Sequence, residues 1–119
     1  MAAIQGGDVN ERDTRWFGDT PLHLAALENQ VEAIQKLVLL GADVNSQNQL
    51  GYTPLHYAVM EGNRKAVKKL LMLGADVKAV NGEGRTPVQE AQFRGHLICS
   101  DIILSFAGFG NESWQDLSD

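Results

Sequence analysis

Residues 20–23, Thr-Pro-Leu-His, return unchanged at residues 53–56, which lie 33 positions later. Thr86 and Pro87 follow at the same interval. A second motif, Gly-Ala-Asp-Val, recurs with the same period at residues 41–44 and 74–77. Similarity at a fixed period of this length is typical of a chain built from stacked, similar units. The period therefore predicts a solenoid whose repeated residues serve the stacking of those units.

The residue types within each period predict how one unit begins. The Thr hydroxyl accepts a hydrogen bond from an unpaired N–H at the start of a helix. Pro suits the first helical position, because the N–H that it lacks has no partner there. Each Thr-Pro pair therefore predicts a helix start. A residue suited to a tight turn follows nine positions after each Thr, namely Asn29, Gly62 and Gly95.

A second helix is predicted after each turn, because apolar residues recur there at helical spacing. Gly41 and Gly74 supply the left-handed residue that ends such a helix. A polar stretch, residues 46–51, then predicts a hairpin turn. The unit is therefore expected to run helix, turn, helix, hairpin. The apolar residues of the second helices are Val31, Ile34, Leu37 and Val38, then Val67, Leu70 and Leu71, then Leu97, Ile102 and Ile103.

These motifs closely resemble the ankyrin repeat, whose signature Thr-Pro-Leu-His-x-Ala is met in full by residues 20–25 and 53–58. The resemblance extends over about residues 8–108. It implies an all-α solenoid of helix-turn-helix units joined by β-hairpin-like loops, which project beside a concave face made by the first helices. It also implies protein binding without chemistry. We expect a partial repeat at 1–13, repeats at 14–46 and 47–79, a capping repeat at 80–108 and an acidic tail at 109–119.

The third unit departs from the first two at two positions. Glu90 takes the place of Leu24, and Gln92 takes the place of Ala26. Because terminal repeats need a polar outer face for solubility, we expect both side chains to meet water.

The first full unit has no complete neighbour on its N-terminal side. Residues 7–10 resemble the tail of an earlier unit, and the loop at 10–20 is two residues longer than its counterpart at 45–53. Either the chain is part of a longer array, or something else covers the exposed apolar face. We expect Trp16 and Phe17, with residues 2–9, to cover it, and hence a monomer in preference to a two-fold dimer.

Composition bounds the function classes. The net charge of −5 argues against a nucleic-acid partner, because nonspecific binding depends on neutralising phosphates. No apolar run approaches the length of a membrane span, and no basic, apolar signal sequence follows Met1. The single cysteine, Cys99, falls on the last apolar stripe and is expected to be buried. One cysteine fits a reducing compartment, so we expect a cytoplasmic or nuclear protein.

A search for chemistry yields no candidate active site. His23 and His56 belong to the repeat motif, and the ankyrin resemblance implies that their rings bond the backbone and the motif Thr. A metal site needs several convergent ligands, which the sequence does not group. It also contains no phosphate-binding glycine motif, and no nucleophile with a base and an orienting acid. We therefore expect no catalytic residue, metal or cofactor, and no enzymatic activity.

Members of the family bind partners through hairpin tips and the exposed side of the first helix. Carried onto this chain, the resemblance predicts an adaptor or scaffold, and the alternative is a regulator that inhibits or chaperones an enzyme by occluding its surface. Aromatic residues and Met are enriched at such interfaces. The predicted partner-binding residues are Trp16, Phe17, Asp19, Leu27, Leu50, Tyr52, Met60, Glu61, Arg85, Phe93 and Arg94.

Two further segments each allow two interpretations. Arg64, Lys65, Lys68 and Lys69 cluster on one helical face. They form either a docking site for an acidic partner or phosphopeptide or, as we favour, a solvated convex surface. The acidic tail at 109–119 is either an interaction segment or a short helix anchored over the last unit by Trp114.

Asn45 matches a pattern at which asparagine is hydroxylated in animal ankyrin repeats. It is therefore a candidate for hydroxylation if the source is animal. An Asn in such a turn also has an ordinary structural role, which we favour as its whole role.

Overall fold

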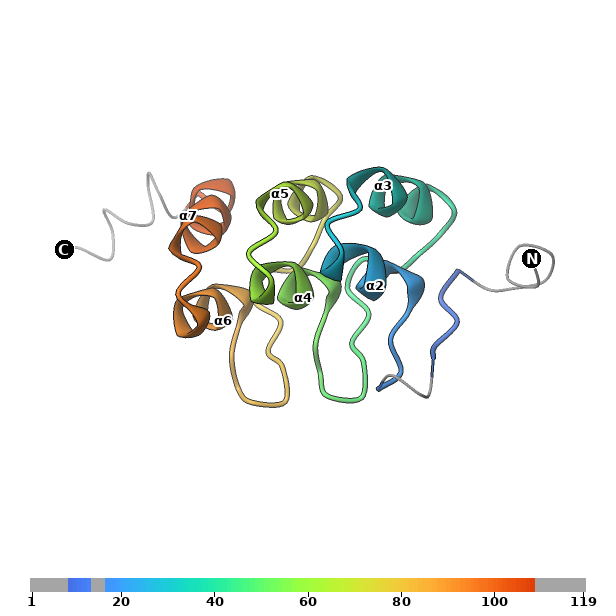
Figure 1. Cartoon of the computed structure of the whole chain (residues 1–119), viewed down its shortest axis with the longest axis horizontal. Helices are drawn as coiled ribbons and strands as arrows, with labels where there is room; N and C mark the ends of the chain where they lie inside the picture. Colours follow the sequence, from blue (N-terminus) through green and yellow to red (C-terminus); the bar gives the residue numbers. More distant parts are fainter. Residues whose placement is uncertain (1–8, 14–16, 109–119) are drawn as a thin grey trace.

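The computed structural model describes residues 9–13 and 17–108, and within them it forms six helices arranged as three helix-turn-helix pairs (Figure 1). The only β pairing in this part of the chain is an isolated bridge between Asp13 and Asp19. The expected all-α solenoid is confirmed. The helices are α2 (Pro21–Leu27), α3 (Val31–Leu39), α4 (Pro54–Met60), α5 (Arg64–Met72), α6 (Pro87–Arg94) and α7 (Leu97–Phe106).

The helices stand in two rows, with α2, α4 and α6 in one row and α3, α5 and α7 in the other (Figure 1). Each helix packs on its partner in the same unit and on the equivalent helix of the next unit. The loops before α4 and α6 project from the row of first helices, away from the second helices. The arrangement leaves the first helices and the loops as one continuous side of the molecule.

Each first helix begins at its Thr-Pro pair, as predicted. Thr20 and Thr53 cap α2 and α4 by accepting the N–H of His23 and His56, and each His Nδ1 accepts the N–H of its Thr in return. The other ring nitrogen, Nε2, lies 2.7 Å from the Tyr52 carbonyl oxygen in His23 and 3.0 Å from the Arg85 carbonyl oxygen in His56. The structural role predicted for both histidines is confirmed.

The core consists mainly of the repeated apolar positions. Leu22 and Leu55 of the first helices and Ile34, Leu70 and Ile103 of the second helices are fully buried. Burying a Leu or Ile side chain contributes about 1.5–3 kcal/mol to the free energy of folding. These layers, which run through all three units, are the main source of the stability of the array.

Leu97 was expected in the core, and this prediction is wrong, because its side chain is 60% exposed. It is the first residue of α7 and occupies the repeat position of Arg64, which is also exposed. The arginine there is therefore ordinary for this position. Cys99 and Ile103 are buried instead, as expected from the apolar stripe.

An asparagine at the start of each unit links it to the next. The Asn10 side chain donates to the Gly41 carbonyl oxygen and accepts the Asp43 N–H at 2.7 Å. The Asn45 side chain repeats both bonds one unit later, to the Gly74 carbonyl oxygen and the Asp76 N–H. Residues before the first full unit thus make the contacts of a preceding repeat.

Val9 also packs against the core and covers part of the first unit. Phe17 does not, because its side chain is half exposed in a turn with φ 61°. Residues 2–8 and Trp16, which were expected to complete the cover, lie outside the described residues.

Candidate functional site

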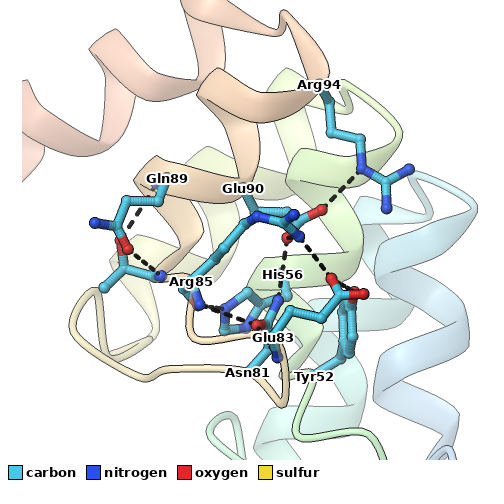
Figure 2. A network of polar contacts seen from close by, with 9 residues as sticks. Tyr52, His56, Asn81, Glu83, Arg85, Gln89, Glu90 and Arg94 are labelled. Atoms are coloured by element: carbon cyan, nitrogen blue, oxygen red, sulfur yellow. Dashed lines mark hydrogen bonds and ion pairs between the residues drawn. The ribbon is translucent and has the colours of Figure 1, made fainter.

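The polar centre of the third unit is Glu90, a residue of α6 that was expected to meet water. This expectation is wrong, because Glu90 is fully buried. Its Oε2 accepts a hydrogen bond from Arg94 Nε at 2.8 Å, and its Oε1 accepts bonds from Asn81 and Arg85 (Figure 2). Three donors compensate for the burial of one carboxylate, as a buried charge requires. The other departure, Gln92, is exposed as expected.

The same contacts set the ionisation of Glu90. Burial alone would raise its pKa, but the hydrogen bonds from Arg94, Asn81 and Arg85 outweigh burial and hold the pKa below its usual value of 4.5. Glu90 is therefore an anion at neutral pH. Its charge fixes both arginine side chains in place.

Arg85 connects Glu90 to the loop before α6. Its guanidinium also pairs with Glu83 at 2.6 Å, and the Tyr52 hydroxyl donates to the same Glu83 oxygen from the preceding loop. Figure 2 shows Glu83 between Tyr52 and Arg85. The chain Tyr52–Glu83–Arg85–Glu90 therefore links two units by side chains alone.

The outermost member of this cluster is Phe93. The Arg85 guanidinium carbon lies 3.8 Å from the centroid of the Phe93 ring, within the range of a cation–π contact. Phe93 is 66% exposed. An aromatic ring is thus held against a fixed guanidinium on one side and open to solvent elsewhere.

The second unit carries a related buried cluster around Tyr57, which holds the repeat position of Glu90. The Tyr57 hydroxyl donates to Asp19 at 2.8 Å, and the side-chain amide of Asn48 donates to the same carboxylate. Burial and the Asp19 carboxylate raise the pKa of Tyr57, so its hydroxyl keeps the proton that it donates. Asn48 and Asn81 hold equivalent places in the two loops.

These clusters correct two predicted contact residues. Asp19 and Tyr52 were expected at exposed loop tips, and both are buried. Asp19 accepts bonds from Tyr57 and Asn48, while Tyr52 packs edge to face on His56. Burial leaves both side chains little surface for a partner.

The structure divides the other predicted contact residues by exposure. Leu27 and Met60 are half-buried and pack against the core. Arg85 is also half-buried. Trp16 lies outside the described residues. The exposed ones are Phe17, Leu50, Glu61, Phe93 and Arg94.

Leu50 borders a hollow of about 540 Å³ between neighbouring loops, lined by residues 47–52 and 80–83. The loops touch directly beside it, where the Gly82 N–H donates to the Leu50 carbonyl oxygen at 2.8 Å. The side of the molecule formed by the loops is therefore grooved but internally braced.

The four predicted basic residues of α5 do not share one environment. Arg64, Lys65 and Lys68 are exposed, whereas Lys69 is half-buried and donates to the Gln35 side chain of α3 at 2.9 Å. Lys68 borders α7 instead. The cluster is thus split between two helix boundaries.

Within residues 9–13 and 17–108, no group of three or more His, Cys, Asp or Glu side chains could hold a metal ion. Cys99 is buried, and burial raises the pKa of its thiol, which disfavours the reactive thiolate. No helix in this part of the chain is long and apolar enough to cross a membrane.

The sequence interpretation missed Glu90 as a structural centre. Two signals were available, namely the recurrence of Asn48 as Asn81 one period later, and the spacing of four residues between Glu90 and Arg94. Oppositely charged residues at that spacing meet on one helix face.

A protein-family model described as ankyrin repeats (3 copies) matches residues 1–81. The match covers more than half of the 119-residue chain and ends before α6. Beyond it, Thr86 caps α6 through the same type of capping box, in which Gln89 replaces the motif His. The architecture of the matched units thus continues to Phe106.

Proposed function

The chain belongs to the ankyrin-repeat family, and from this premise we propose that it is an adaptor or scaffold whose partner binds the side formed by the first helices and loops. Ankyrin repeats are generally protein–protein interaction modules and are typically non-catalytic. The proposal adds to this general function a surface and its contact residues.

The observation that carries the proposal is the pairing of exposed Phe93 with Arg85. Aromatic and Arg side chains dominate the binding energy of protein interfaces. Glu90 and Glu83 already hold the Arg85 guanidinium, so a partner would lose little side-chain entropy in binding there. Phe93 and Arg85 are thus suited to be the centre of an interface.

The remaining contacts follow from exposure. We place Arg94 and Glu61 beside Phe93 on the first helices, and Leu50 and Phe17 at the loops, at the edge of the interface. Asp19 and Tyr52 support the loops from beneath. Leu27 and Met60 contribute their half-exposed sides, and Trp16 stays a predicted contact.

The test is a comparative pull-down from native lysate, read by quantitative mass spectrometry. Wild type is compared with Phe93→Ala and with a control, Leu39→Ala, which removes an exposed apolar side chain from the other row of helices. We expect the specific partner to be retained by the control and lost with Phe93→Ala. A partner that Phe93→Ala retains undiminished would contradict the proposed surface.

The alternative function is a regulator that inhibits or chaperones an enzyme. The same surface serves both functions, so the identified partner decides between them. If that partner is an enzyme, its activity is measured with and without the purified chain. Inhibition that Phe93→Ala abolishes would favour the regulator, and unchanged activity in a stable complex would favour the scaffold.

Four minor predictions complete the proposal. The chain is monomeric, which light scattering tests, and it resides in the cytoplasm or nucleus, which imaging of the tagged chain tests. The basic residues of α5 form a solvated surface and not a docking site. Asn45 stays a predicted hydroxylation position, tested by peptide mapping of the native protein for one added oxygen atom.

A further inference from the structure

An apolar groove of about 500 Å³ runs between α5 and α7, on the row of helices opposite the proposed partner surface. Met72 of α5 and Ile98, Ile102 and Phe106 of α7 line it, with Lys68 and Asp101 as its charged members. Met72, Ile98 and Phe106 are each more than half exposed. Clustered apolar exposure of this kind marks a binding surface.

We propose that the groove is the docking site of the chain's own tail, residues 109–119, with Trp114 and Leu117 as the apolar anchors. The tail follows directly from α7, whose last turn contributes Phe106 to the groove. Trp114 and Leu117 are three residues apart, a spacing that lets both face one surface in a helical turn. This inference is independent of the proposed partner surface.

The direction in which the chain leaves α7 supports docking. Gly108 follows the last helical residues with φ 88°, and its N–H donates to the Ser105 carbonyl oxygen. A left-handed glycine at this position turns the chain off the helix axis. The chain thus changes direction beside Phe106, at the end of the groove.

The tail is also long enough. The groove extends along α7 from Phe106 to Ile98, eight residues or about 12 Å at the rise of a helix. Trp114 lies six residues beyond Gly108, which is about 20 Å in extended chain. Trp114 can therefore reach any part of the groove, with slack for a turn.

Charge favours this occupant. Residues 109–119 carry three acidic side chains, Glu112, Asp116 and Asp119, and no Lys or Arg. The exposed face of α5 beside the groove carries Arg64, Lys65 and Lys68. Opposite charges across a docking surface steer the occupant and fix its register. A second copy of this acidic chain has no comparable advantage.

The experiment uses the full chain with Trp16→Phe, which leaves Trp114 as its one tryptophan. Trp114 emission and its quenching by acrylamide are compared with those of a free peptide of residues 109–119. We expect emission at shorter wavelength and weaker quenching in the protein, both independent of protein concentration. Met72→Ser and Ile98→Ser should each restore the quenching of the free peptide, and Lys68→Glu should weaken the protection.

The matched control is Leu39→Ser, because Leu39 holds the repeat position of Met72 on α3 and is equally open to solvent. It should leave Trp114 protected. Both groove substitutions replace exposed side chains, and circular dichroism checks that each variant is folded. Trp114 quenched as in the free peptide would overturn the proposal, as would protection unchanged by Met72→Ser and Ile98→Ser. Protection that rises with concentration together with a dimeric mass would assign the groove to a second copy.

Discussion

At the scale of single residues, the burial of Glu90 depends on donors from three places in the chain. Asn81 and Arg85 come from the loop before α6, and Arg94 comes from the next turn of the same helix. Each hydrogen bond to a charged group contributes about 1.5–3 kcal/mol. Arg94 and Arg85 are partly exposed, so water screens their share and the lower end of that range applies.

Glu90→Gln should therefore lower the free energy of unfolding by about 1–3 kcal/mol at pH 7, because the amide offers the arginines no charge. Urea denaturation measures the change. The control is Glu61→Gln, which neutralises an exposed carboxylate at the end of α4 and should change little. Equal effects of the two substitutions would contradict the role given to Glu90.

The same substitution should alter the response to acid. The pKa of Glu90 is lower in the folded chain than its usual 4.5. The carboxylate's stabilisation is therefore complete above pH 4.5 and is lost as the pH falls toward the folded-state pKa. Between those values wild type should lose stability more steeply than Glu90→Gln. Parallel curves of unfolding free energy against pH would contradict this expectation.

Glu90 also shows why sequence alone misplaced a residue. Its charge and terminal unit suggested water, since polar side chains on end repeats usually face solvent. Burial depends on whether donors converge, and Asn81 and Arg85 reach Glu90 only once the loop has folded against α6. Tyr52 and Asp19 were misplaced for the same reason, because contacts between units and not repeat position decide their exposure.

At the scale of elements, the sequence predicted helix starts and ends well because local chemistry determines them. Thr20, Thr53 and Thr86 each cap a helix with their own neighbours, and Gly41 and Gly74 adopt positive φ independently of distant contacts. The apolar face of α7 was less predictable, since Leu97, Ile98, Ile102 and Ile103 offer apolar side chains around much of the helix. Only packing against α5 and α6 selects Cys99 and Ile103.

Leu70→Ala should destabilise the array by about 2–5 kcal/mol, the usual cost of deleting a core leucine. Leu70 is fully buried in α5, which packs on α3, α4 and α7. Leu97→Ala is the matched control, because Leu97 was predicted in the same stripe but is exposed. A thermal melt should shift strongly for Leu70→Ala and slightly for Leu97→Ala, and the reverse order would refute the assigned helix faces.

The contact between neighbouring loops gives a second prediction at this scale. Gly51 has φ 82°, and a Cβ there would lie 2.7 Å from the backbone nitrogen of Gly82. Gly84 has φ 80°, yet a Cβ there would meet nothing within 4 Å. Left-handed backbone costs an alanine about 1–2 kcal/mol at either position. Gly51→Ala should therefore destabilise more than Gly84→Ala in chemical denaturation, and equal losses would mean that the loops separate easily.

At the scale of the whole molecule, the units are joined by a repeated set of contacts, and two of these depend on neutral imidazoles. The Tyr52 and Arg85 carbonyl oxygens each meet a histidine Nε2 of the preceding unit. Asn10 and Asn45 make the corresponding links at the other edge of the units. Nearest-neighbour contacts of this kind couple the stability of one repeat to the next.

Protonation of His23 and His56 should therefore weaken the array as a whole. Burial lowers the pKa of both rings below the usual 6.5. The unfolded chain binds these protons at higher pH than the folded chain does, so stability is complete above pH 6.5 and is lost as the pH falls below it. Each histidine contributes at most about 1.4 kcal/mol per pH unit to that slope.

The double variant His23→Gln/His56→Gln isolates this effect, because Gln89 already serves as the capping side chain of α6. Its unfolding free energy should be lower than that of wild type at pH 7.5, since each substitution removes the ring nitrogen that meets the next unit's carbonyl oxygen. Between pH 6.5 and 5 its stability should depend less on pH than that of wild type, with the single variants intermediate. Equilibrium urea denaturation across this range provides the measurement. A double variant that keeps the wild-type slope would show that other groups carry the acid sensitivity, and the link between imidazole charge and stacking would fail.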